Sequence, residues 1–163
     1  QIPQLFGKLT VVEHMLVALT ARDRAEGDVW RPLKRRDRIA EATHILSEFG
    51  LSDVAGQGVA TLAEGERKVL DVAICLALQP RLLLLDEPTS GVSNRDKLSI
   101  MERLVRALKR AGVTVVFVEH DLEVVRQYAE RILVFGDGRV VADGPPSAVL
   151  EGISVSGPQG GLR

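Results

Sequence analysis

Apolar residues recur at the three- to four-residue spacing of a helix in several stretches of this chain. Charged or glycine-containing connectors separate these stretches, and the longest connector, residues 20–35, contains Pro32. The pattern predicts helices over residues 10–19, 36–49, 63–78, 94–111 and 121–128.

Two of these helices begin with the pattern of a capping box, in which Ser or Thr is followed three positions later by Glu or Gln. Thr10 and Glu13 fit the pattern at the first helix, and Thr61 and Glu64 fit it near the helix over residues 63–78. We expect each pair to satisfy free backbone N–H groups at its helix start.

Short apolar runs predict the strands. Four consecutive leucines at residues 82–85 are typical of a strand buried on both faces, and residues 113–118 form a second run of this kind. Because a helical pattern separates the two strands, we expect them to lie parallel in an α/β sheet. Residues 132–135 and 140–142 flank Gly-Asp-Gly, which predicts a hairpin. The tail, residues 153–163, is rich in glycine and serine and is expected to be disordered.

Composition narrows the class of protein. The chain has 163 residues, of which 45% are hydrophobic and 26% charged, as in ordinary globular domains. Its formal net charge of −1 offers no electrostatic case for nucleic acid or anionic lipid. The single cysteine, Cys75, excludes an internal disulfide and fits a reducing compartment. No apolar run approaches the roughly 20 residues that span a bilayer.

The strand over residues 82–85 ends in two carboxylates, Asp86 and Glu87. The carboxyl ends of parallel strands are where open α/β sheets bind ligands. One carboxylate there can hold Mg²⁺ while the other orients a water for phosphoanhydride hydrolysis. A solvated acidic turn explains the two residues equally well when they are taken alone.

Two further positions carry weaker signals. His120 follows the second buried strand, and it would lie at the same sheet edge as Glu87. A loop histidine without a function is the simpler interpretation of His120 alone. Residues 62–66 lie where a helix begins, and helix N-termini attract phosphate. A plain capped helix explains that segment equally well.

Together and in this order, these segments resemble the nucleotide-binding domain of ABC transporters. In that family a signature motif, LSGGQ, precedes an apolar strand ending in Asp-Glu-Pro, the Walker B motif; a D-loop and a strand ending in His follow. The resemblance covers about residues 1–150. The matching positions are Gln1 for the Q-loop glutamine; Leu62, Ala63, Glu64, Gly65 and Glu66 for the signature; Asp86 and Glu87 for Walker B; Ser90 and Ser93 for the D-loop; and His120 for the switch histidine.

The resemblance implies an α/β fold: a partial P-loop NTPase (RecA-like) parallel sheet with a helical subdomain. Residues 1–80 would form the Q-loop and helical subdomain, residues 81–150 the later half of the ATPase core, and residues 151–163 a flexible tail. It also implies ATP and Mg²⁺ as cofactors. Gln1 and Asp86 would hold the metal, Glu87 and His120 would be catalytic, and the signature and D-loop positions would contact nucleotide.

The implied partners are a second ABC ATPase subunit, which is either identical or non-identical, membrane permease subunits and, indirectly, a solute-binding protein, with no nucleic acid. The protein would be cytoplasmic and peripheral on the cytoplasmic face of the membrane. The opening residues and the charged insert look most like the ATPases of branched-chain amino-acid importers, and urea and amide importers share these features.

The chain departs from the family pattern in two ways. The phosphate-gripping loop, G-x-x-x-x-G-K-[ST], is absent, which together with Gln1 as first residue suggests a missing front portion. Ala63 stands where the family has the signature serine, and Ser93 stands where many members have Asp. We therefore expect the chain alone to be inactive. Two alternatives stay open: a non-transport ABC ATPase that acts on DNA, and a catalytically silent fragment.

Overall fold

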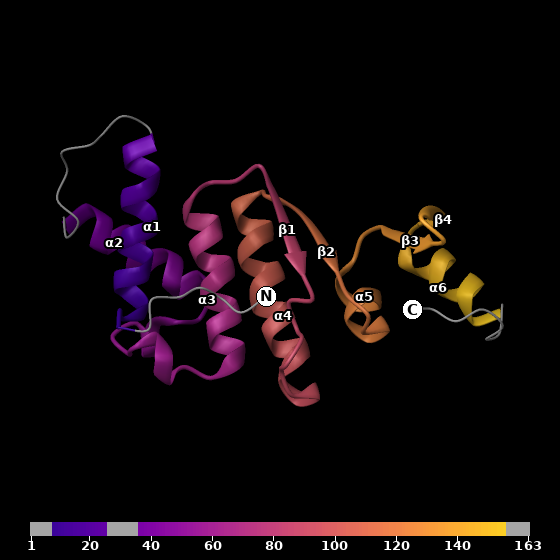
Figure 1. Ribbon diagram of the computed structural model, residues 1–163, viewed down its shortest axis with the longest axis horizontal. Helices are drawn as coiled ribbons and strands as arrows, with labels where there is room; N and C mark the ends of the chain where they lie inside the picture. Colours follow the sequence, from indigo (N-terminus) through magenta and orange to yellow (C-terminus); the bar gives the residue numbers. More distant parts are fainter. Residues whose placement is uncertain (1–7, 26–35, 156–163) are drawn as a thin grey trace. The chain divides into compact units, whose positions relative to one another are not determined.

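The structure, a computed structural model, describes residues 8–25 and 36–155 (Figure 1). The chain divides into two compact units, Gln1–Val118 and Glu119–Arg163, and each is described by itself. No helix within the described residues is long and apolar enough to cross a membrane.

The first unit begins with a helical bundle. Helices α1 (Val11–Ala25), α2 (Arg36–Glu48) and α3 (Glu64–Ala77) pack against one another, and the short 3-10 turns η1 (Ser52–Val54) and η2 (Val59–Thr61) connect α2 to α3 (Figure 1). The apolar stripe of each helix faces the same core, as its spacing predicts. The fully buried side chains there include Met15, Leu19, Leu46, Phe49, Leu51 and Leu70.

The capping box at the start of α1 is confirmed. The Glu13 side chain accepts a hydrogen bond from the Thr10 N–H at 3.0 Å, and the Glu13 N–H donates to Thr10 Oγ1 at 3.3 Å. These reciprocal bonds satisfy two donors that the first turn of a helix would otherwise leave free.

The prediction of a second capping box, made by Thr61 and Glu64, is wrong. Ala63, not Thr61, is the N-cap residue of α3, and its N–H donates to the Glu66 side chain at 3.0 Å. Thr61 lies in η2, where its hydroxyl donates to the Gly58 carbonyl instead. Because Thr61 belongs to the 3-10 turn, the N-cap of α3 lies two positions later than expected, at Ala63.

The sheet of the first unit is parallel, as expected. Strands β1 (Leu82–Asp86) and β2 (Thr114–Val118) pair with Leu83 opposite Val115, and α4 (Asn94–Ala111) connects them. Gly112, at a φ of 68°, ends α4 in the left-handed conformation that glycine adopts without strain.

The prediction that β1 is buried on both faces is wrong for the described residues. Leu84 is 70% exposed, and Val116, its partner across the sheet, is 49% exposed. On the opposite face of the pair, Leu83 is buried and Leu85, Val115 and Phe117 are half-buried. The two strands therefore present one open apolar face, made by Leu82, Leu84, Val116 and Val118.

The second unit contains the expected hairpin. Helix α5 (Leu122–Tyr128) precedes the antiparallel strands β3 (Ile132–Gly136) and β4 (Arg139–Gly144), and α6 (Pro146–Val155) follows. The turn residues Asp137 and Gly138 both have positive φ, as tight hairpin turns require. Helix α6 extends to Val155, so the expected flexible tail is helical over residues 151–155, and residues 156–163 lie outside the described part.

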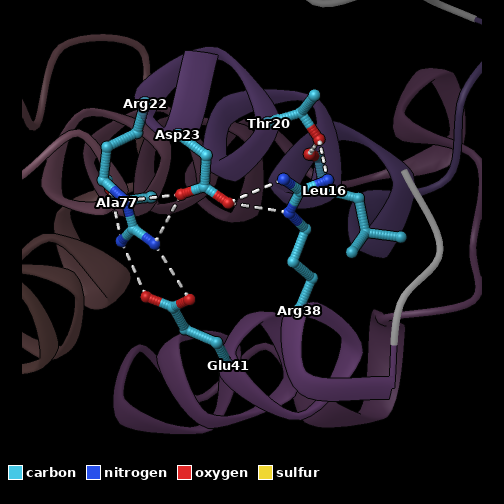
Figure 2. A network of polar contacts seen from close by, with 7 residues as sticks. All are labelled: Leu16, Thr20, Arg22, Asp23, Arg38, Glu41 and Ala77. Atoms are coloured by element: carbon cyan, nitrogen blue, oxygen red, sulfur yellow. Dashed lines mark hydrogen bonds and ion pairs between the residues drawn. The ribbon is translucent and has the colours of Figure 1, made fainter. Parts of the chain in front are cut away.

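A polar network joins α1 to α2 at the end of the bundle (Figure 2). Arg38, which is 3% exposed, reaches from α2 to Asp23 on α1, with Nε 2.8 Å from Oδ2. Arg22 makes two bonds to Glu41, at 2.7 and 3.0 Å, and donates to the Ala77 carbonyl at 3.3 Å. The arginines thereby link all three helices of the bundle.

Charge pairing sets the protonation of Asp23. Burial opposes ionisation of this carboxyl, but hydrogen bonds from Arg38 and Arg22 outweigh burial and hold its pKa below the ordinary value. Asp23 is therefore ionised at neutral pH and balances the buried Arg38 guanidinium.

Candidate functional site

The loop that follows β1 carries the acidic pair. Asp86 ends the strand opposite Val118, and both Asp86 and Glu87 are exposed. Glu87 has a φ of 44°, in the left-handed region, which costs a residue other than glycine about 1–2 kcal/mol. The non-glycine residue of this loop with a left-handed backbone is therefore the one that the resemblance predicts to be catalytic.

Hydrogen bonds hold Glu87 in this conformation. Its N–H donates to the Val118 carbonyl at 2.9 Å, which extends the pairing of β1 with β2 by one bond. Its carbonyl accepts from the Ser90 N–H at 3.0 Å and from the Lys68 ammonium at 3.2 Å. The peptide groups on both sides of the Glu87 Cα are thus tied to their surroundings.

The positions that resemble the signature form the entrance to α3. Leu62 is buried, whereas Ala63 and Glu64 are exposed and Gly65 and Glu66 are half-buried. Glu64 forms an ion pair with Arg67 at 3.2 Å. The exposed entrance of a helix has free N–H groups that can bind a phosphate, but Glu64 places a negative charge beside them.

The entrance of α3 packs closely against α4 and the loop before it. A Cβ added at Gly65 would lie 2.4 Å from Ile100 Cδ1, and one added at Gly91 would lie 3.7 Å from Glu64 Cγ. Gly91 also has a φ of 73°. The structure therefore brings the signature-like and D-loop-like segments together within one subunit, which the sequence did not predict.

Gly65→Ala should lower the free energy of unfolding by about 1–2 kcal/mol, because overpacking against buried Ile100 exceeds the gain in helix propensity. In an Ile100→Val background, where Cδ1 is missing, the same change should be neutral or stabilising. Urea denaturation of the four proteins measures both effects. Equal losses in the two backgrounds would show that the Ile100 contact is unimportant.

The carboxyl of Asp71, on α3, has an unusual pKa. Burial, followed by repulsion from Glu64, raises the pKa of Asp71 to about 6, although Lys68 partly opposes the shift. The folded chain therefore binds a proton at Asp71 more tightly than the unfolded chain does. Ionised Asp71 consequently reduces stability as the pH rises from about 4 through 6.

Asp71→Asn should raise the free energy of unfolding at pH 7 by about 1 kcal/mol. This value is kept low because the side chain is only half-buried and solvent screens its charge. At pH 4 the gain should vanish, because Asp71 is then protonated in the folded protein. Thermal denaturation at both pH values gives the comparison. An equal gain at both values would rule out titration of Asp71 as the cause.

The donor set fits magnesium in part. Asp86 offers carboxylate oxygens at the end of β1, and Mg²⁺ is commonly held by one or two carboxylates together with water and substrate phosphates. Gln1, the other expected ligand, lies outside the described residues. No group of three or more His, Cys, Asp or Glu side chains that could hold a metal ion exists among the described residues.

The structure groups most of the expected site residues. Asp86, Glu87, Ser90 and the α3 entrance belong to the first unit, where Lys68 bridges α3 to Glu87. Ser93 is the N-cap residue of α4, and its hydroxyl donates to Asp96 at 2.6 Å. His120 belongs to the second unit and its side chain is 69% exposed, so its proximity to Glu87 stays a prediction.

Sequence reasoning missed Lys68. A signal was present, since Lys68 lies four residues after Glu64 and therefore on the same helix face. The spacing alone could not show which carbonyl the ammonium would meet, because that carbonyl comes from a loop nineteen residues away.

Comparison with known proteins points to one family. Residues 1–90 match the family described as "ABC transporter". The chain is 36% identical over 153 residues to the probable branched-chain amino acid transport ATP-binding protein LivG of Archaeoglobus fulgidus, covering 92% of this chain and 59% of that protein. It is 35% identical over 144 residues to the phosphonates import ATP-binding protein PhnC 1 of a Synechococcus species, covering 88% and 54%.

Solved structures agree with these relatives. CbiO1 of Clostridium perfringens, part of the ABC transporter complex cbiONQ, matches with a TM-score of 0.76 at 27% identity, over 93% of this chain and 57% of that one. A nucleotide-free ATP-binding cassette from an ABC transporter matches with a TM-score of 0.77 at 25% identity, over 97% and 63%. The α/β fold with a parallel sheet, of the P-loop NTPase class, is therefore confirmed, and the chain spans a little over half the length of these proteins.

Proposed function

This chain belongs to the ABC transporter family of ATP-binding proteins, and from that premise we propose that it is the later part of an ATP-hydrolysing subunit of an importer. The observation that carries the proposal is the acidic pair at the end of β1, with Glu87 tied by Lys68 to the helix whose entrance resembles the signature. The open apolar face of β1 and β2 fits the proposal, since parallel sheets of α/β domains are covered on both faces.

The proposed roles follow from chemistry at the end of β1. Glu87 accepts a proton from, or orients, the water that attacks the terminal phosphate of ATP. Asp86, with Gln1, holds Mg²⁺, which when bound neutralises charge on the phosphates. His120 contacts the terminal phosphate. The α3 entrance and the D-loop positions, from Leu62 to Glu66 with Ser90 and Ser93, contact nucleotide held by a second ATPase subunit.

The alanine at position 63 indicates whether the second subunit is identical to this one. A hydroxyl at this position would add a hydrogen bond to a charged phosphate, worth roughly 1.5–3 kcal/mol. Two identical subunits would lack this bond in both sites, whereas a partner with a serine would restore it in one. We therefore propose pairing with a non-identical ATPase, on membrane permease subunits at the cytoplasmic face.

For the solute, we propose branched-chain amino acids or related compounds, supported by the similarity to LivG and to BraF of Pseudomonas aeruginosa, which is 30% identical. The similarity to PhnC 1 makes phosphonates the specific competitor. Reconstituted with its permease in vesicles, the complete subunit should drive ATP-dependent uptake of labelled leucine. Uptake of a phosphonate instead would reassign the solute but keep the importer role.

Hydrolysis itself is tested with the complete subunit and Mg-ATP, by measuring phosphate release. We expect turnover that Asp86→Asn abolishes and that an exposed substitution on α4, Glu102→Gln, leaves unchanged. If the complete subunit, alone and with its partners, released no phosphate, the silent-protein alternative would replace the ATPase proposal.

A further inference from the structure

Lys68 connects two segments that the sequence separates. It lies in the second turn of α3, and its ammonium donates to the carbonyl of Glu87 at 3.2 Å. One turn earlier, Glu64 and Gly65 lie against Gly91 and against Ile100 of α4. Helix α3 therefore contacts the loop after β1 at two places: at Glu87, where the loop begins, and at Gly91, near the end of the loop.

The Glu87 carbonyl is a sensitive point for such a contact. Glu87 has a positive φ, a backbone conformation that is unfavourable for residues other than glycine. Contacts with the surrounding structure must therefore maintain it. The Ser90 N–H and the Lys68 ammonium both donate to this carbonyl, and the first of these bonds is local to the turn. Lys68 supplies a tertiary bond to this carbonyl from α3, and its donor is charged.

We propose that Lys68 is a positioning residue for Glu87, so that the α3 entrance and the carboxylate at the end of β1 move as one body. The inference rests on the proposed function for its catalytic consequence, but the contact itself is a property of this chain. Without the ammonium, the Glu87 peptide rotates more freely and its carboxylate spends less time at the attacking water. Misplacement by about 1 Å can cost 100-fold in rate.

The first experiment needs no nucleotide. Amide hydrogen exchange of Glu87 and Ser90, measured by NMR on the 163-residue chain, reports the bonds at the turn directly. Lys68→Met should speed exchange of both amides several-fold, whereas Lys68→Arg, which keeps a charged donor, should retain the slow rates. Lys109→Met, in the last turn of α4, is the matched control for loss of a lysine. Unchanged exchange in a folded Lys68→Met protein would overturn the proposal.

The second experiment uses the complete subunit. Lys68→Met should lower kcat for ATP hydrolysis by about 10- to 100-fold with little change in KM, and Lys68→Arg should recover most of the loss. A purely structural role would instead lower the melting temperature and leave kcat per folded molecule unchanged, which would also overturn the proposal. If exchange responds as expected while the unmodified subunit hydrolyses no ATP, the proposed function fails and the positioning contact stands.

If Lys68→Met does not fold, Lys68→Gln takes its place, because it keeps a neutral donor on a shorter side chain. Intermediate exchange rates at Glu87 and Ser90 would support the proposal. Rates equal to those of the unmodified chain would overturn it, since a neutral, shorter donor should not replace the ammonium fully.

Discussion

Glu87→Gln in the complete subunit should lower the rate of ATP hydrolysis by about 100- to 10,000-fold, the range that a positioned general base contributes. Glutamine keeps the size and the hydrogen-bonding carbonyl of the side chain but cannot take a proton from water. ATP binding should change little, because Asp86, and not Glu87, is expected to hold the metal ion that neutralises charge on the phosphates. Single-turnover phosphate release and equilibrium ATP binding separate the two effects.

The control for this experiment is Glu102→Gln, which neutralises an exposed carboxylate paired with Arg106 on α4. It should leave both binding and turnover unchanged. Turnover in Glu87→Gln equal to that of the unmodified subunit would remove Glu87 from the mechanism, and a loss of ATP binding would place it in binding instead of catalysis.

Asp23→Ala should lower the free energy of unfolding by about 3 kcal/mol, at the lower end of the cost of breaking a buried ion pair. The substitution removes the carboxylate that faces Arg38, whose guanidinium is almost fully buried (Figure 2). Because hydrogen bonds hold the pKa of Asp23 below its ordinary value, its contribution is present above about pH 4 and is lost as the pH falls below that value. Urea denaturation at pH 7 and pH 3 tests both the size and the sign.

A double variant distinguishes the ion pair from simple loss of packing. Replacing both partners, as Asp23→Leu with Arg38→Met, removes the buried charges together and should recover most of the lost stability. If the double variant were less stable than Asp23→Ala, the network would owe its effect to shape and not to charge compensation.

Local patterns in the sequence predicted much of the fold. The Thr10–Glu13 capping box, the helix over residues 36–49 and the turn at Asp137 depend on neighbours within a few positions. Such features are set by backbone hydrogen bonds and side-chain periodicity that one segment satisfies by itself. The order of the motifs likewise identified the family and placed Asp86 and Glu87 at the end of a strand.

Local competition explains one failure. Thr61 and Glu64 have the spacing of a capping box, but Thr61 lies in a 3-10 turn and Glu66 caps the helix instead. Both arrangements satisfy free backbone donors, so the pattern could not choose between them. The folded chain adopts the 3-10 turn at Thr61, and the neighbouring Val59 is buried there.

Other features depended on the tertiary structure because their partners are distant in sequence. The exposure of Leu84 is set by what covers each face of the strand pair, and four consecutive leucines carry no information about that. The pairing of Arg38 with Asp23 and the close approach of Gly65 to Ile100 required the helices to be packed first. The sequence by itself determined which residues could do chemistry and in what order they occur. Only packing decided that Lys68 reaches the Glu87 carbonyl, because a hydrogen bond between residues nineteen positions apart exists only after a helix and a strand end have been placed side by side.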